Sequence, residues 1–170
     1  MKLSNYDFKT KIQLFIATVV FVFLFRYLPH PPNFTPVIAL TFYSAVFFGL
    51  PSSVFVILAF AISDIFIGLH NLLFFTWGGL ALISLLSKIS SNFFSRMMLL
   101  VLSSIIFFIV SNFGVWLLSN FYPKNFDGLF KCYLLAIPFF SNTFVSTLIF
   151  GLLFEIFKME KIKIRMFDHK

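Results

Sequence analysis

Six long runs of apolar residues, almost free of charge, are the feature that most constrains the fold of this chain. They cover residues 12–28, 37–50, 52–69, 72–87, 97–118 and 134–157. A helix needs about 20 such residues to cross the ~30 Å hydrocarbon core of a bilayer. Charged residues make up 11% of the chain, against roughly 25% in soluble domains. The pattern predicts an all-α integral membrane bundle of six transmembrane helices, with tails at residues 1–11 and 158–170.

Two runs depart from an upright crossing. The run at residues 37–50 lies between two prolines, and its 14 residues give only about 21 Å of helix. Such a short span predicts that the preceding loop, residues 29–35, sinks into the protein. The last apolar stretch, residues 129–157, is too long for one upright helix. Pro138 predicts a break within it, with an interfacial piece at residues 128–137 before the crossing.

The basic residues predict the orientation of the bundle. Ten of the thirteen Lys and Arg residues fall in the two tails or in the second and fourth loops, which share one side of the membrane when six helices cross it. Lys and Arg concentrate on the cytoplasmic side, so both termini are expected there. The net charge of +7 is then an orientation signal, and nucleic-acid binding is not expected. Cys132 is the single cysteine, which excludes an intramolecular disulfide.

The unusual polar and aromatic residues gather on the opposite, outer side. Polar groups at membrane depth are costly and usually line a cavity or contact one another. A pocket that opens outward is the simplest explanation. Its candidate substrate-binding residues are Arg26, His30, Asn33, Asp64, His70, Asn71, Asn112, Trp116 and Lys124.

Asp64 lies about five residues from the outer end of its run, roughly 8 Å deep by helix rise. A lone ionised carboxylate in lipid costs several kcal/mol, so Asp64 must face the bundle and have a partner. Arg26 is the available one, with His30 and His70 as weaker candidates. The pair could equally be a structural ion pair that fixes the loops or part of a functional site.

Metal binding and catalysis have little support. No two of the His and Asp residues stand at i, i+3 or i+4, so the spacing indicates no metal site. The chain also lacks GxxxxGK[ST], HExxH and GxSxG. We therefore expect no catalytic residue, no metal and no resident cofactor, and an intramembrane enzyme built on Asp64 and the histidines is the least favoured function. Trp77 and Trp116 are interpreted first as interfacial belt residues, although Trp116 shares a helix face with Asn112.

A row of small residues runs along the last span. Thr143, Thr147 and Gly151 recur at i+4, and Glu155 continues the row. Such stripes let helices approach closely. The row is expected to pack within the bundle, and a face for a partner protein is the alternative.

Several short strings carry a resemblance to a known group of proteins. They are Arg26-Tyr27-Leu28-Pro29-His30-Pro31-Pro32-Asn33-Phe34-Thr35-Pro36, Ser63-Asp64, Asn112-Phe113-Gly114-Val115-Trp116, Tyr122-Pro123, Gly128-Leu129, Cys132-Tyr133, Ala136-Ile137-Pro138-Phe139 and Asn142-Thr143. With these strings the chain resembles an uncharacterised family of bacterial membrane proteins. That family is in turn similar to the substrate-binding S components of energy-coupling factor (ECF) transporters, through its size, six-helix plan and outer-loop pocket.

The resemblance implies a multi-pass protein of the bacterial cytoplasmic membrane that captures a vitamin-like solute between its outer loops. A transmembrane coupling subunit and ATPases would then drive release inside. One feature departs from the pattern. S components often carry small residues one turn apart in the first helix, whereas here Ala17 is followed at i+4 by Phe21.

These features together predict the substrate-binding membrane subunit of an uptake transporter. The alternative is a non-catalytic six-span scaffold or envelope assembly protein without a ligand. A scaffold for cytoplasmic partners should carry its polar residues in the inner loops and tails, whereas a solute binder should concentrate them outside. The distribution of polar residues favours the binder.

Overall fold

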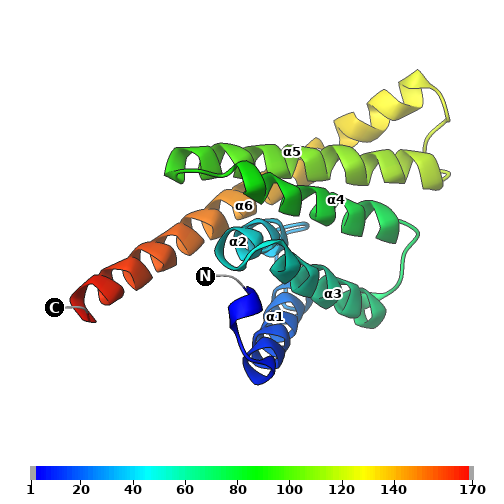
Figure 1. Cartoon of the computed structure of the whole chain (residues 1–170). Helices are drawn as coiled ribbons and strands as arrows, with labels where there is room; N and C mark the ends of the chain where they lie inside the picture. Colours follow the sequence, from blue (N-terminus) through cyan, green and yellow to red (C-terminus); the bar gives the residue numbers. More distant parts are fainter. Residues whose placement is uncertain (1–2, 169–170) are drawn as a thin grey trace.

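A computed structural model describes residues 3–168, with side chains up to residue 158. Within that part of the chain every regular element is a helix, which confirms the predicted all-α class with six α-helices (Figure 1). The elements are η1 (Leu3–Asn5), α1 (Phe8–Tyr27), α2 (Val37–Phe48), α3 (Leu50–Ile67), α4 (Leu73–Leu86), η2 (Ser87–Ile89), α5 (Phe93–Leu118) and α6 (Phe126–Asp168).

Four of the helices in the described chain, α1, α3, α5 and α6, are long and apolar enough to cross a membrane. Helices α2 and α4 are apolar but shorter. Many large apolar side chains on the long helices are exposed at the surface of the bundle, an arrangement that suits lipid and not water. The helices therefore indicate a membrane protein.

The bundle has two ends, which we name by their connections. The loop end holds the α1–α2, α3–α4 and α5–α6 connections, and the turn end holds η1, the α2–α3 turn at Gly49 and the α4–α5 connection with η2. In Figure 1 the α3–α4 and α5–α6 connections lie on the right, and the α4–α5 connection lies on the left with the C-terminal part of α6. Connections that are far apart in the sequence thus lie at the same end of the bundle (Figure 1).

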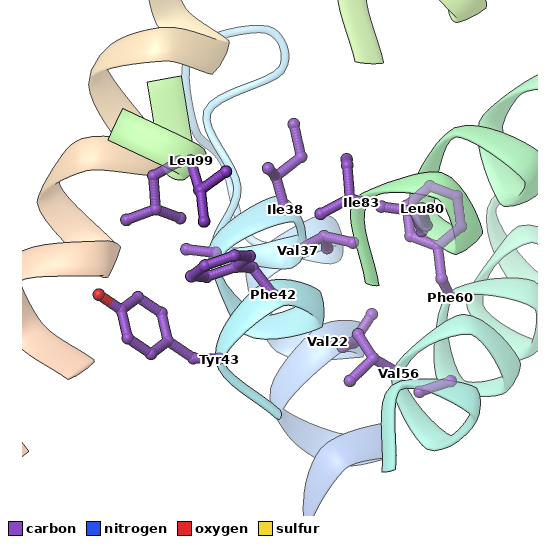
Figure 2. Packing of buried hydrophobic residues seen from close by; sticks show 13 residues of the cluster. Val22, Val37, Ile38, Phe42, Tyr43, Val56, Phe60, Leu80, Ile83 and Leu99 are labelled. Atoms are coloured by element: carbon purple, nitrogen blue, oxygen red, sulfur yellow. The ribbon is translucent and has the colours of Figure 1, made fainter. Parts of the chain in front are cut away.

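Helix α2 forms the centre of the bundle and packs against α3, α4, α5 and α6. Seven of its twelve residues are buried, among them Phe42 and Tyr43. Figure 2 shows these two side chains within the cluster of Val22, Val56, Leu80, Ile83 and Leu99, which come from the surrounding helices. At about 18 Å by helix rise, α2 is too short to cross a bilayer. Because the surrounding helices bury it, its ends need not reach the membrane surfaces.

The loop before α2 does not sink into the protein as the sequence predicts. Pro29 and residues 31–33 are exposed, and the chain becomes fully buried only at Pro36. Asn33 adopts a left-handed conformation with φ 63°, which asparagine tolerates better than most residues. The Asn142 side chain donates to Pro32 O at 3.0 Å and ties the loop to α6. Because α2 is covered by other helices, the loop need not enter the bundle to complete it.

The predicted break at Pro138 is also wrong. Helix α6 runs without interruption from Phe126 to Asp168, with Pro138 inside it. A proline removes one backbone hydrogen bond, here the one to Leu134 O, and the turns on either side keep theirs. Residues 128–137 are therefore the first turns of α6 and not a separate interfacial piece.

Helix α1 lies at the edge of the bundle. It packs mainly on α3, and Val22 is its only buried residue. Phe8, Ile12, Ile16, Val20 and Leu24 follow one another at i+4 and are all exposed, so they form one continuous apolar face. This face suits contact with lipid along the whole helix.

Candidate functional site

The loop end encloses a cavity of about 320 Å³, within the size range of small-molecule sites. Helices α1, α3, α4, α5 and α6, the start of α2 and two loops contribute to its wall. Its polar side chains are Arg26, Asn33, Thr35, His70, Thr76, Ser111, Asn112 and Thr143, and its aromatic ones are Phe60, Phe107, Phe108, Phe139 and Phe140. A set of convergent polar groups among aromatic rings is typical of a solute site.

Arg26 stands in the last turn of α1, which ends at Tyr27 just before Pro29. Its Nη1 lies 2.7 Å from Asp64 Oδ1, so the predicted ion pair is present. The same nitrogen donates to Phe60 O at 3.1 Å and to Ser63 Oγ. The guanidinium also stacks 3.9 Å above the Phe60 ring, a favourable cation–π contact. One arginine thereby joins α1 to α3 at the cavity wall.

The Asp64 carboxylate is fully buried behind this wall. Its Oδ2 accepts a hydrogen bond from Trp77 Nε1 at 2.8 Å. Its Oδ1 lies 2.7 Å from Arg26 Nη1. The loop-end ion pair is therefore made through a single guanidinium nitrogen, which also donates to Phe60 O.

His70 lies between the carboxylate and the cavity. Its Nε2 is 3.9 Å from Asp64 Oδ1, which is beyond hydrogen-bond distance. Its Nδ1 accepts from the Leu72 backbone N–H at 3.2 Å. That bond assigns the proton of a neutral ring to Nε2, on the side of Asp64. Gly68, with φ 133°, ends α3 four residues after Asp64 and makes the short loop that places His70 there.

Of the nine residues predicted for a pocket, Arg26, Asn33, His70 and Asn112 line this cavity. Asp64 is not part of the wall, but it lies 2.7 Å from Arg26 and 3.9 Å from His70, which are. The other four, His30, Asn71, Trp116 and Lys124, are not part of its wall.

Trp116 and Lys124 instead brace the α5–α6 connection. Trp116 Nε1 donates to Pro123 O at 2.9 Å, and Lys124 Nζ donates to Trp116 O and Ser119 O. His30 Nδ1 lies 2.7 Å from Pro31 O in the exposed loop.

Several residues of the site were missed by sequence reasoning. Thr35 and Thr76 carry no signal that separates them from other threonines. Thr143 is predicted only as part of the packing row, and its side chain lies in the cavity wall as well. Trp77 is predicted to be a belt residue, and the structure shows that it also donates a hydrogen bond to Asp64. The nearly charge-free surroundings of Asp64 were the one available clue, because a buried carboxylate requires a donor.

The wall of the cavity carries several groups that can form hydrogen bonds. Within the part of the chain whose side chains are described, no group of three His, Cys, Asp or Glu residues is placed to hold a metal ion. Asn112 Nδ2 donates to Phe108 O at 2.8 Å in its own helix, which leaves its Oδ1 and second N–H available. Ser111 Oγ donates to Phe107 O and keeps its acceptor capacity. These groups can hydrogen-bond a solute among the aromatic rings.

A second polar cluster, at the turn end, was also missed. Arg96 Nη2 donates to Glu155 Oε2 at 2.9 Å, and Arg96 Nε donates to Oε1. Tyr43 Oη donates to Glu155 Oε1 at 2.7 Å, and Figure 2 shows that hydroxyl directed towards the ribbon of α6. All three side chains are buried. The cluster ties α2, α5 and α6 together.

The row of small residues on α6 leads to this cluster. Thr143, Thr147, Gly151 and Glu155 are all buried in the bundle. A Cβ added at Gly151 would lie 2.3 Å from Leu100 Cδ1, so glycine permits the close approach of α5. The row therefore packs inside the protein, and it is not exposed to a partner.

Comparisons with known proteins place the chain in a family without assigning its activity. No curated protein and no solved structure matches it. The comparisons therefore give no support to the resemblance to ECF S components. A family model described as a family of unknown function (DUF6580) matches residues 6–166, which is nearly the whole chain. The protein therefore belongs to the DUF6580 family.

Proposed function

We propose that this protein is the substrate-binding membrane subunit of an uptake transporter and captures a small, vitamin-like solute in the loop-end cavity. The observation that carries the proposal is the cavity itself. It has a volume of about 320 Å³ and brings together Arg26, Asn33, His70 and Asn112 from four separate segments. Sites of this kind, with a few convergent polar groups in a mostly apolar wall, are the usual form of a solute pocket.

The charge of the wall favours an uncharged or zwitterionic solute. Arg26 and His70 are the ionisable residues among those that line the cavity. The charge of Arg26 is compensated by Asp64 at 2.7 Å, so an anion would have to compete with a buried carboxylate. The amides and hydroxyls suit hydrogen bonding, and the five phenylalanines suit stacking on a flat ring.

In the proposed orientation the loop end faces outward and the turn end faces the cytoplasm, in a bacterial cytoplasmic membrane. The ten Lys and Arg residues of the tails and turn-end loops support it, since positive charge accumulates on the cytoplasmic side. A coupling subunit and ATPases would be the partners, as for S components. The first helix departs from those proteins at Ala17 and Phe21, so a coupling subunit would dock on other helices.

The test is thermal unfolding of the purified protein with a panel of vitamins and their precursors. A bound solute stabilises the native state by RT ln(1 + [L]/Kd), which is about 2.7 kcal/mol at a hundredfold excess over Kd. One member of the panel should raise Tm. Asn112→Ala should abolish that rise, because it removes a side chain of the wall, whereas Asn71→Ala, outside the wall, should leave it unchanged.

Two results would contradict the proposal. The first is no rise in Tm across a broad panel, together with no ATPase that copurifies, which would favour the scaffold. The second is a C-terminal reporter fusion that is active outside the cell. That result would turn the cavity towards the cytoplasm and remove the basis for uptake.

A further inference from the structure

A second cavity lies at the turn end, on the opposite side of the bundle from the proposed solute site. Its volume is about 230 Å³. It lies among α1, α2, α3 and α6, where α1 packs on α3 and stands apart from the other helices. Leu3 of η1 contributes to the wall and is buried, so the N-terminal segment covers one end of the cavity.

The wall of this cavity offers little to a polar solute. It is largely made of leucine and phenylalanine side chains, among them Leu14, Leu40, Phe47 and Phe154. Its hydroxyl groups are already used within the protein. Thr18 donates to Leu14 O, Ser44 to Thr41 O, Ser52 to Ser44 O and Gly49 O, and Tyr43 to Glu155.

The cavity is large enough to hold a hydrocarbon group. An apolar cavity of about 150 Å³ stays free of water and takes up hydrocarbon such as benzene. The turn-end cavity is larger, and the protein around it is surrounded by lipid chains rather than by water. A hydrocarbon chain from the bilayer is therefore the occupant that its chemistry favours.

A cation stands at the rim of this apolar space. Lys158 Nζ lies 5.9 Å from the centroid of the Phe47 ring, and Phe47 lines the cavity. The neighbouring Arg96 and Glu155 neutralise each other. Lys158 forms no ion pair with any residue whose side chain the structure describes, and its ammonium group suits contact with an anion at this rim.

We propose that the turn-end cavity binds one acyl chain of an anionic phospholipid, whose phosphate group lies against Lys158. The apolar wall selects a hydrocarbon chain, and the lysine selects a negatively charged headgroup over a zwitterionic one. The site would fill the space between α1 and α2 that the protein leaves empty. It does not depend on the proposed solute site.

Native mass spectrometry of the detergent-purified protein tests the proposal. The protein is titrated with palmitoyl-oleoyl phosphatidylglycerol and, separately, with phosphatidylcholine of the same chains. Phosphatidylglycerol should bind at one site about fivefold more tightly, since a single lysine at a membrane surface contributes about that preference. Lys158→Gln should remove the preference. Lys88→Gln, an exposed cation at the same end, should preserve it.

The acyl chain is tested by filling the cavity. Thr18→Phe adds a ring to the wall and loses only a bond within α1, so binding of both lipids should fall. Val20→Phe adds the same ring to the exposed face of α1 and should have no effect. Thr18→Met is the substitute if Thr18→Phe does not fold. Full binding in a filled variant that folds, or an unchanged preference in Lys158→Gln, would overturn the proposal, and so would displacement of the lipid by inorganic phosphate alone.

Discussion

Each end of the bundle contains one buried arginine–carboxylate pair, and the two are built differently. At the turn end, both oxygens of Glu155 accept hydrogen bonds from Arg96, and Tyr43 adds a third donor. At the loop end, Asp64 Oδ1 is paired with a single nitrogen of Arg26 at 2.7 Å, Trp77 donates to Oδ2, and the Arg26 side chain is 14% exposed.

The difference separates a bidentate pair enclosed by helices from a pair that borders a cavity. A bidentate arginine–carboxylate pair with every group satisfied fixes the geometry of the elements that it joins. The Arg26–Asp64 pair also joins two helices, but it does so through one guanidinium nitrogen and places the guanidinium in a cavity wall. Burial alone would not have distinguished the two pairs.

The largest effect is expected from breaking the turn-end pair. Glu155→Gln removes the charge that neutralises the buried Arg96, and an unpaired buried charge typically costs about 3–5 kcal/mol. Unfolding of the protein from mild detergent by added SDS would measure the loss. The double variant Arg96→Met/Glu155→Leu should restore part of the stability, because apolar residues can replace a buried pair, although the Tyr43 hydroxyl loses its acceptor. A loss in the double variant as large as in Glu155→Gln would show that the pair itself is not the cause.

A smaller effect is expected from the corresponding change at the loop end. Asp64→Asn removes the countercharge of Arg26, but that side chain borders a cavity and keeps its bonds to Phe60 O and Ser63. We expect a loss of about 2–3 kcal/mol, in the range of a hydrogen bond to a charged group. Asp127→Asn, at an exposed position near the same end, is the control. A loss larger than that of Glu155→Gln would reverse the comparison.

The smallest effects are expected at two glycines, Gly151 at a helix contact and Gly78 away from one. Gly151→Ala would place a Cβ 2.3 Å from Leu100 Cδ1, and relief of that contact should cost about 1–2 kcal/mol, since the clash is with the tip of a side chain. Gly78, on α4, has nothing within 4 Å of an added Cβ. Gly78→Ala should therefore stabilise the protein by about 0.5–1 kcal/mol. Melting curves of the two variants should shift in opposite directions.

The features of this protein that could be predicted are those that follow from a local sequence pattern. Apolar runs gave the six helices, and the cost of a buried charge identified Arg26 as the partner of Asp64 although 38 residues separate them. The same reasoning did not predict the pair of Arg96 and Glu155. Glu155 was counted only as the end of a row of small residues, and Arg96 as one more cation of an inner loop. Nothing in the sequence shows that two such positions face each other.

Residues at loops were placed least well. His30 and Asn71 are polar like the residues of the cavity wall but lie outside it. The direction of a loop side chain depends on the backbone turns, which the polarity of the residue does not reveal. The predicted helix break at Pro138 was wrong for a different reason. A proline weakens a helix locally, and whether the chain breaks there depends on the packing of both neighbouring turns.

The burial of α2 has a consequence for how the protein is made. A helix of twelve residues gives a weak signal for entry into the bilayer, which favours stretches near 20 residues. We therefore expect α2 to enter as a hairpin with α3, through the turn at Gly49, after α1 is in place. Insertion assays on nascent chains that end after Phe48 and after Ile67 should show α2 in the membrane only in the longer one. The segment at the centre of the finished bundle would then be the one least able to reach it alone.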